Sequence, residues 1–182
     1  MDYKTKPISR ENLRIIAKFI KTKFGCKNKY RFDVIDAFER IHSLFPQITV
    51  EVVDDDKLNT NNPARCVPDG LGNYHIEVKN RVYQGACRGT GAYRDHIMHE
   101  ICHAILCILG FTPIFERAFK ETDLKPYESM EWQAKALCGE VLVPYDNIYG
   151  LSIKQIMNYC KVSKSCASLA KKNSAKNNYY WI

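Results

Sequence analysis

Hydrophobic residues recur at intervals of three and four along several stretches of the chain, which predicts amphipathic helices. The first series follows Ser9, a residue type that caps helices, precedes Gly25, and consists of Leu13, Ile16, Ala17, Ile20 and Phe24. A second series begins near Asp33 and stops before Pro46. We expect two further helices, over residues 93–109 and 128–143, ending at Gly110 and Pro144.

Two other stretches alternate between hydrophobic and polar residues, which is typical of half-buried strands. Residues 48–53 form the first, before a polar loop over residues 54–63. Residues 74–79 form the second, with a continuation to Val82 and Tyr83 also considered, and Asp69-Gly70 and Gly72-Asn73 supply turns before it. The chain is therefore expected to be an α+β protein, mainly helical, with a small sheet that precedes the central helices.

The last part of the chain predicts a short helical tail. Residues 151–172 fit two short helices, with Ser163 capping the second, in an arrangement like a helix-turn-helix. We expect one main domain over residues 1–150, with a basic helix within residues 1–31, and a small basic tail over residues 151–182.

Composition narrows the class of protein. The 182 residues are 46% hydrophobic, which is enough to bury one core and excludes a disordered chain. The longest apolar run, residues 104–111, is too short to cross a membrane, and no apolar segment of a secretory signal follows the N-terminal lysines. The 8 cysteines include no Cys-x-x-Cys pair, so we expect reduced thiols and a cytoplasmic location instead of disulfides or a zinc ribbon.

The net charge of +7 is unevenly distributed. Residues 1–31 carry ten Lys and Arg against two acids, residues 32–150 carry eleven against eighteen, and residues 151–182 carry six Lys and no acid. Basic ends could bind nucleic acid, but solvated lysine-rich helix faces are the commoner explanation. We expect no direct binding of nucleic acid and keep DNA binding through the basic tail as an alternative.

The candidate catalytic and metal-binding residues lie in the expected helix over residues 93–109, which contains His99-Glu100-Ile101-Cys102-His103. Residues four apart share one helix face, so His99 and His103 can offer two imidazole nitrogens to one Zn²⁺ at about 2.0 to 2.1 Å. Glu100 lies beside them, where its carboxylate can accept the proton of a metal-bound water as general base. This pattern predicts a zinc-dependent peptidase.

A catalytic zinc site of this kind needs a third protein ligand. The next expected helix offers Glu128, Glu131 and Glu140, and the sequence after Glu131 favours that residue. Small residues follow it at Ala134, Ala136, Cys138 and Gly139, and they would let this helix pack closely against the helix that carries the two histidines.

These residues resemble the ImmA/IrrE family of zinc metallopeptidases. The resemblance rests on Arg94 before the motif, on His99-Glu100-x-x-His103 and on the segment from Glu131 to Leu142-Val143-Pro144, and it covers about residues 32 to 170. It implies a zincin-like fold, His99, His103 and Glu131 as zinc ligands, and Glu100 as the general base. It also implies a cytoplasmic endopeptidase, often encoded on a mobile element or acting in a stress response, that inactivates a partner transcriptional repressor.

Some positions depart from the family pattern or stay open. His96 could contact substrate or sit exposed at the helix edge, and Cys138 could be a redox-sensitive thiol or a small packing residue. The donor that would stabilise the oxyanion is not identified, with Tyr93, Tyr127, Tyr145 and His96 chemically able. The strand over residues 74–79 is a candidate to bind an extended peptide edge to edge.

A second functional hypothesis belongs to a different class. In it, the protein is a regulatory module that binds and sequesters a repressor without cleavage, and the zinc site is structural or latent. The complete set of water-activating residues favours the peptidase. The identity of the substrate and the oligomeric state are not predicted.

Overall fold

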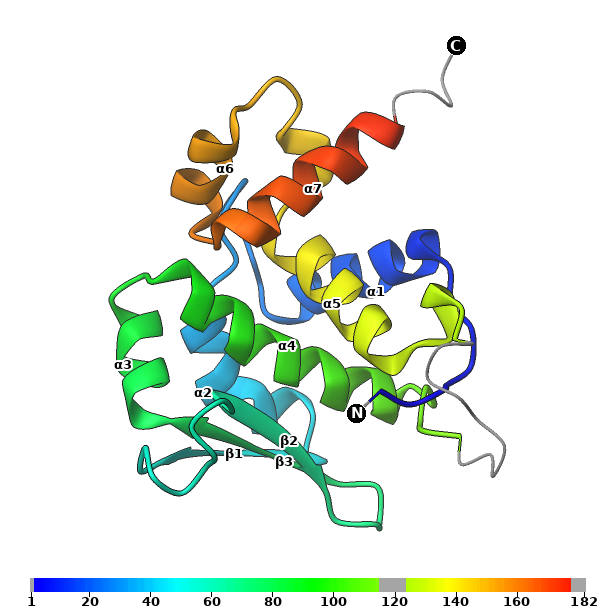
Figure 1. Ribbon diagram of the computed structural model, residues 1–182, viewed down its shortest axis with the longest axis vertical. Helices are drawn as coiled ribbons and strands as arrows, with labels where there is room; N and C mark the ends of the chain where they lie inside the picture. Colours follow the sequence, from blue (N-terminus) through cyan, green and yellow to red (C-terminus); the bar gives the residue numbers. More distant parts are fainter. Residues whose placement is uncertain (1, 115–123, 178–182) are drawn as a thin grey trace.

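The computed structural model describes residues 2–114 and 124–177 and is an α+β protein with seven α-helices and one three-stranded sheet in those ranges (Figure 1). Two short 3₁₀ helices, η2 (Pro126–Glu128) and η3 (Tyr145–Asn147), flank the fifth α-helix. In chain order the elements are α1 (Arg10–Lys23), α2 (Val34–Leu44), β1 (Ile48–Val53), β2 (Ala64–Pro68), β3 (Tyr74–Lys79), α3 (Asn80–Cys87), α4 (Gly91–Ile108), α5 (Met130–Leu142), α6 (Ile153–Cys160) and α7 (Lys164–Asn177).

The sheet has the strand order β1-β3-β2. β3 pairs in parallel with β1 and antiparallel with β2, so β3 is the central strand and both of its edges are occupied. The expectation that residues 74–79 bind a peptide at their edge is therefore wrong, because an added strand can reach only β1 or β2. The strand β2 was not predicted from the sequence.

Most expected helices and their caps are confirmed. Ser9 Oγ accepts a hydrogen bond from Asn12 N, and Asp33 caps α2 in the same way. The expected continuation of the second strand to residues 82 and 83 is wrong, because the chain turns into α3 at Asn80. Val82 and Ala86 are buried at an interval of four, so this segment has the helical period.

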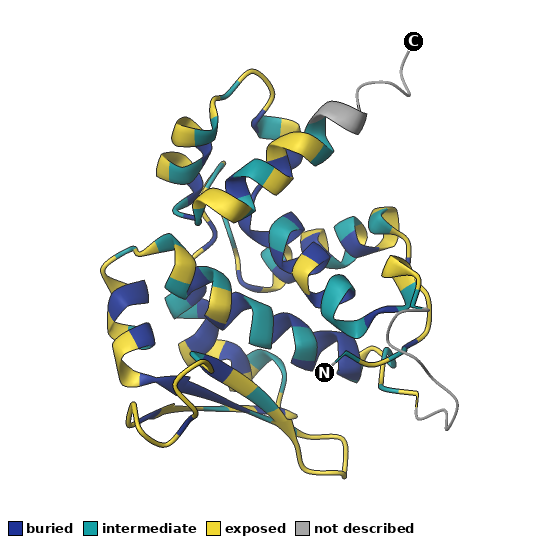
Figure 2. Ribbon diagram, viewed as in Figure 1, coloured by how far each residue is buried: buried dark blue, intermediate teal, exposed yellow. Residues whose placement is uncertain are grey.

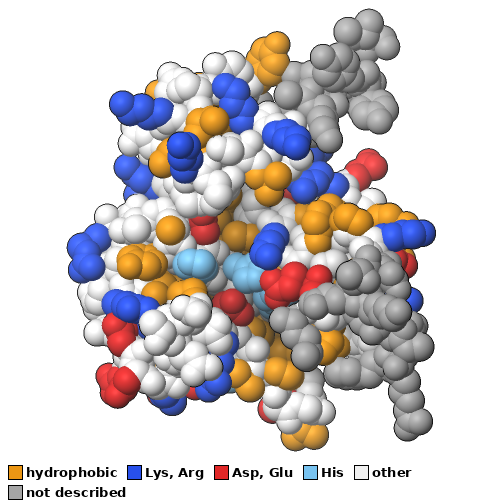
Figure 3. All heavy atoms as spheres, in the orientation of Figure 1, with side chains coloured by type: hydrophobic (Ala, Val, Ile, Leu, Met, Phe, Trp, Pro, Cys, Tyr) orange, Lys and Arg blue, Asp and Glu red, His pale blue; other side chains and the backbone are white. Residues whose placement is uncertain are grey.

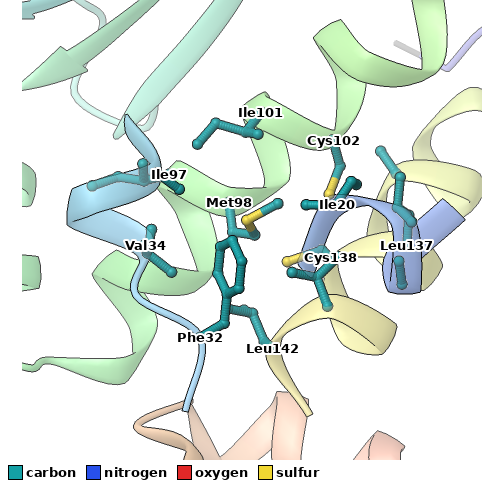
Figure 4. Close-up of a cluster of buried hydrophobic side chains, with 14 of the residues drawn as sticks. Ile20, Phe32, Val34, Ile97, Met98, Ile101, Cys102, Leu137, Cys138 and Leu142 are labelled. Atoms are coloured by element: carbon teal, nitrogen blue, oxygen red, sulfur yellow. The ribbon is translucent and has the colours of Figure 1, made fainter. Parts of the chain in front are cut away.

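Helix α4 crosses the middle of the molecule, with the sheet on one side and α5 on the other (Figure 1). Figure 2 shows that α4 carries buried residues along most of its length, and α1 packs on the far side of α5. Figure 4 shows how side chains from α1, α2, α4 and α5 meet in this core, among them Ile20, Val34, Met98, Leu137 and Cys138. The helix that carries the histidine motif is thus held from several directions.

The tail packs onto the same core. Ile156, Val162 and Ala167 belong to one cluster of buried residues with the helices of the main body. The turn between α6 and α7 lies so close to α4 that a Cβ atom on Gly91 would come within 2.3 Å of the backbone carbon of Val162. Ser163 caps α7 as predicted, since its Oγ accepts from Cys166 N. Residues 178–182 of the predicted tail lie outside the described residues.

No helix in the described ranges is both long enough and apolar enough to pass through a membrane.

Candidate metal centre

The two histidines and the glutamate expected as metal ligands lie together. His99 and His103 are on successive turns of α4, and their Nε2 atoms are 3.0 Å apart. Glu131, the second residue of α5, places Oε1 3.2 Å from His103 Nε2 and Oε2 3.4 Å from His99 Nε2. Helices α4 and α5 therefore bring together three donors that are distant in the sequence.

This donor set fits a zinc ion. A tetrahedral site with metal–ligand distances of about 2.05 Å separates its ligand atoms by about 3.3 Å. The two Nε2 atoms are 3.0 Å apart, and each lies 3.2 to 3.4 Å from a different oxygen of Glu131, so the three groups are close enough to hold one ion. Two imidazole nitrogens and one carboxylate oxygen are also the donors of zinc sites that keep one position open for water. The three groups are partly exposed, so the site is open to solvent on one side.

The protonation states of the protein without metal suit a cation. Burial lowers the pKa of His99, which favours its neutral imidazole. Hydrogen bonds from the two imidazoles hold the pKa of Glu131 well below its usual range, so its carboxylate is ionised. Metal ligands need these forms, a neutral imidazole and a deprotonated carboxylate.

Glu100 lies beside this cluster but is not part of it. Its side chain lines the same cavity as His103 and Glu131, where burial raises the pKa of Glu100 to about 7. The backbone N–H of Cys66 on β2 faces its carboxylate and favours the ionised form. The candidate base is thus placed between the metal ligands and the edge of the sheet.

A cavity of about 500 Å³ opens next to the cluster. One wall is β2, with Ala64 and Cys66, and the opposite side includes Met130 at the start of α5. Figure 3 shows histidine side chains next to acidic ones in the middle of this face, between the sheet and the helices of the tail. A cavity of this size beside the ligands can accept a segment of another molecule.

His96 and Cys138, whose roles the sequence did not decide, have different surroundings. His96 is exposed on α4, as one of its two interpretations requires. Cys138 is buried between α4 and α5, with its Sγ 3.6 Å from the carbonyl oxygen of Asp95 (Figure 4). Burial and the neighbouring Cys102 thiol raise the pKa of Cys138 above its usual value, so the structure places Cys138 as a packing residue.

The tyrosines considered as oxyanion donors lie elsewhere. Tyr145 is buried, and its hydroxyl oxygen accepts from Arg10 on α1. The ring of Tyr93 packs against Gly85 on α3. Tyr127 lies under Lys125 at the surface, and none of the three is among the described residues that line the cavity.

Other residues of the site were not predicted from the sequence. Tyr3 and Tyr74 line the cavity, and Lys135 Nζ lies 3.6 Å from Glu131 Oε2. Lys135 could have been found from its spacing, because it is four residues after Glu131 on the same helix face. Tyr3 and Tyr74 are brought to the cavity by long-range packing, which no local pattern signals.

A second group that could hold a metal lies on the sheet, at Glu51, His75 and Glu77. Glu77 already forms ion pairs with Arg65 and Lys57, and Lys57 also pairs with Glu51. A metal would have to displace these cations, so we interpret this group as an ion-pair network.

Comparison with known proteins gives no relative, since no family model, no curated protein and no solved structure matches this chain.

Proposed function

We propose that this protein is a zinc-dependent endopeptidase of the ImmA/IrrE type that hydrolyses a peptide bond in a specific partner protein. One observation carries the proposal: His99, His103 and Glu131 converge, with 3.0 to 3.4 Å between their nearest donor atoms, while Glu100 lines the same cavity as His103 and Glu131. The three ligands and the base come from a motif typical of metallopeptidases and from a separate helix.

The chemistry follows from these positions. A zinc ion at the site would polarise the scissile carbonyl and lower the pKa of a bound water. Glu100 accepts the proton of the attacking water on its carboxylate and passes it to the nitrogen of the leaving amine. The Cys66 N–H that faces Glu100 holds this carboxylate toward the cavity.

Among the described residues no strand pairs with the outer edge of β2, and this edge supports a peptide substrate. Lys79 N donates to Pro63 O, so Arg65 and Val67 hydrogen-bond toward β3 and the backbone groups of Ala64 and Cys66 point to the open side. The Cys66 N–H on that side faces Glu100, so the carbonyl groups of Ala64 and Cys66 are the ones offered to a substrate. Residues of β2 line the cavity beside Glu100. An extended segment of the substrate pairs with this edge and brings its backbone carbonyl to the metal centre. Pro68 has no N–H, so pairing ends there.

The nature of the partner rests on the family resemblance, which favours a helix-turn-helix repressor of a mobile element or stress response. The reaction belongs to the cytoplasm, where the eight cysteines, all free in the structure, stay reduced. A module that sequesters the repressor without cutting it would share the binding surface, so cleavage is the property to test.

The test compares native lysates of the host treated with zinc-loaded protein, either unchanged or carrying Glu100→Gln. New N-termini are identified by labelling of amino groups and mass spectrometry. We expect a small set of new termini with the unchanged protein that is absent with Glu100→Gln and after addition of 1,10-phenanthroline. Equal sets of termini from both proteins would contradict the assigned base, and binding without any new terminus would favour the sequestering module.

A further inference from the structure

The N-terminal segment, residues 2–8, is bound along η2 and the start of α5. Met130 N donates to Tyr3 O at 3.0 Å, Thr5 N donates to Glu128 O at 2.8 Å, and Ile8 N donates to Tyr127 O at 3.1 Å. Thr5 and Ile8 are buried, so much of this segment is part of the packed structure.

The side chain of Asp2 reaches the first turn of α5. Its Oδ1 accepts a hydrogen bond from the backbone N–H of Glu131 at 3.1 Å, and its Oδ2 accepts from Ser129 Oγ at 2.5 Å. Ser129 is the N-cap of α5, and its Oγ accepts from Trp132 N. Asp2 and Ser129 therefore satisfy two of the N–H groups that a helix leaves free at its start. The negative charge of Asp2 is also favourable at this end of the helix dipole.

The three candidate metal ligands differ in how firmly their backbone is held. His99 and His103 lie within α4, where the hydrogen bonds of the helix fix the main chain on both sides. Glu131 is the second residue of α5, in the turn that is most prone to fray. Its backbone N–H cannot bond within the helix, and the Asp2 carboxylate supplies the partner.

We propose that Asp2 is a positioning residue for the third metal ligand. By holding the N–H of Glu131, Asp2 fixes the main chain from which the Glu131 side chain reaches both imidazoles. This inference rests on the proposed function only in treating Glu131 as a ligand. Asp2 and Tyr3 also line the cavity, so the same segment shapes the wall that a substrate meets.

Zinc affinity of the full chain tests the inference, measured by competition with a chromogenic chelator. The variants are Asp2→Ala, Asp2→Asn and Asp33→Ala. Asp33 is a matched control, because it caps α2 by accepting from Asp36 N and is not among the candidate ligands or the described cavity wall. Loss of either carboxylate removes a hydrogen bond from a backbone N–H in the first turn of a helix.

We expect Asp2→Ala to bind zinc about 10- to 100-fold more weakly, the range typical when a group that orients a ligand is removed. Asp2→Asn, which keeps one acceptor oxygen, should recover part of that loss. Asp33→Ala should stay within about twofold of the unchanged protein, because its cap is not connected to the ligands. Zinc binding by Asp2→Ala within about twofold of the unchanged protein would overturn the inference.

Amide hydrogen exchange of Glu131 in the metal-free protein provides the second readout. We expect the Glu131 amide to exchange faster in Asp2→Ala than in Asp33→Ala, since only the former loses the acceptor. An unchanged exchange rate of the Glu131 amide in Asp2→Ala would contradict the hydrogen bond between Asp2 and Glu131. Faster exchange with unchanged zinc affinity would contradict the positioning role of Asp2. Absence of zinc binding by the unchanged protein would instead contradict the proposed function.

Discussion

His103 Nε2 and Glu131 Oε1 lie 3.2 Å apart although they belong to different helices, α4 and α5. This contact depends on how closely the two helices approach. Ala134 and Cys138 follow Glu131 at intervals of three and seven residues, on the same side of α5, and both are buried. Small side chains at the interface thus set the distance between the third ligand and the histidines.

Ala134→Leu is expected to push α5 away from α4. The larger side chain has no space at a fully buried position and should lower the free energy of unfolding by about 1 to 3 kcal/mol. It should also weaken zinc binding by about tenfold, because the ligands move apart. Thermal unfolding and zinc competition measure the two effects. Ala92→Leu, at an exposed position of α4, is the control. Equal losses of stability and zinc affinity in both variants would contradict the explanation by the spacing of α4 and α5.

Glu140→Ala is expected to loosen α1 from α5. The Glu140 carboxylate is almost fully buried and pairs with Arg10 and Arg14, each about three-quarters buried. Its loss leaves two partly buried cations without their partner and should cost about 1 to 3 kcal/mol of unfolding free energy in urea titrations. Asp36→Ala breaks the surface pair with Arg40 and should cost no more than about 1 kcal/mol. Similar losses in both variants would argue against a special role for the buried pair.

Gly91→Ala is expected to disturb the junction between α4 and the tail. The added Cβ would lie 2.3 Å from the Val162 carbonyl carbon, and a backbone atom cannot move aside without shifting the turn between α6 and α7. We expect a loss of about 1 to 3 kcal/mol in thermal unfolding. Thr90→Ala, one residue earlier and exposed, should change stability by less than about 0.5 kcal/mol. A stable Gly91→Ala protein would show that the tail is not packed as described.

The thiols are expected to react in the order of their exposure. Cys87 is exposed, whereas Cys102 and Cys138 are buried and face each other between α4 and α5 (Figure 4). Labelling with a disulfide reagent at neutral pH should modify Cys87 first and reach the buried pair only when the protein unfolds. Cys87→Ser should remove the fast phase. Rapid labelling of Cys138 in the folded protein would restore its interpretation as a redox-sensitive residue.

The helices were predictable where hydrophobic period and caps agree, as between Ser9 and Phe24. The strand β2 was not, because its five residues are mostly exposed on a sheet edge and show no clear alternation. Helix α3 occupies the segment that was considered as a continuation of the second strand to Val82 and Tyr83, because the short run after Lys79 contains residues common in both structures. Pairing with β3 decided β2, whereas the burial of Val82 and Ala86 gives α3 the helical period.

The clustering of His99, His103 and Glu131 could be predicted because helix spacing and ligand chemistry limit the choices. The histidine motif fixes a distance of one helix turn, and the small residues after Glu131 indicated which glutamate lies close. Asp2, Cys66 and Tyr74 could not be found in this way. They reach the site through the N-terminal segment and the sheet, whose placement depends on the whole fold.

Metal content of the purified protein tests the proposed metal centre. After dialysis with zinc, the unchanged protein, Glu131→Ala and Glu100→Gln are analysed by inductively coupled plasma mass spectrometry. We expect about one zinc per chain in the unchanged protein and in Glu100→Gln, and loss of most of it in Glu131→Ala, because of these two glutamates Glu131 is the proposed ligand. Absence of zinc from the unchanged protein, or full retention by Glu131→Ala, would contradict the metal centre.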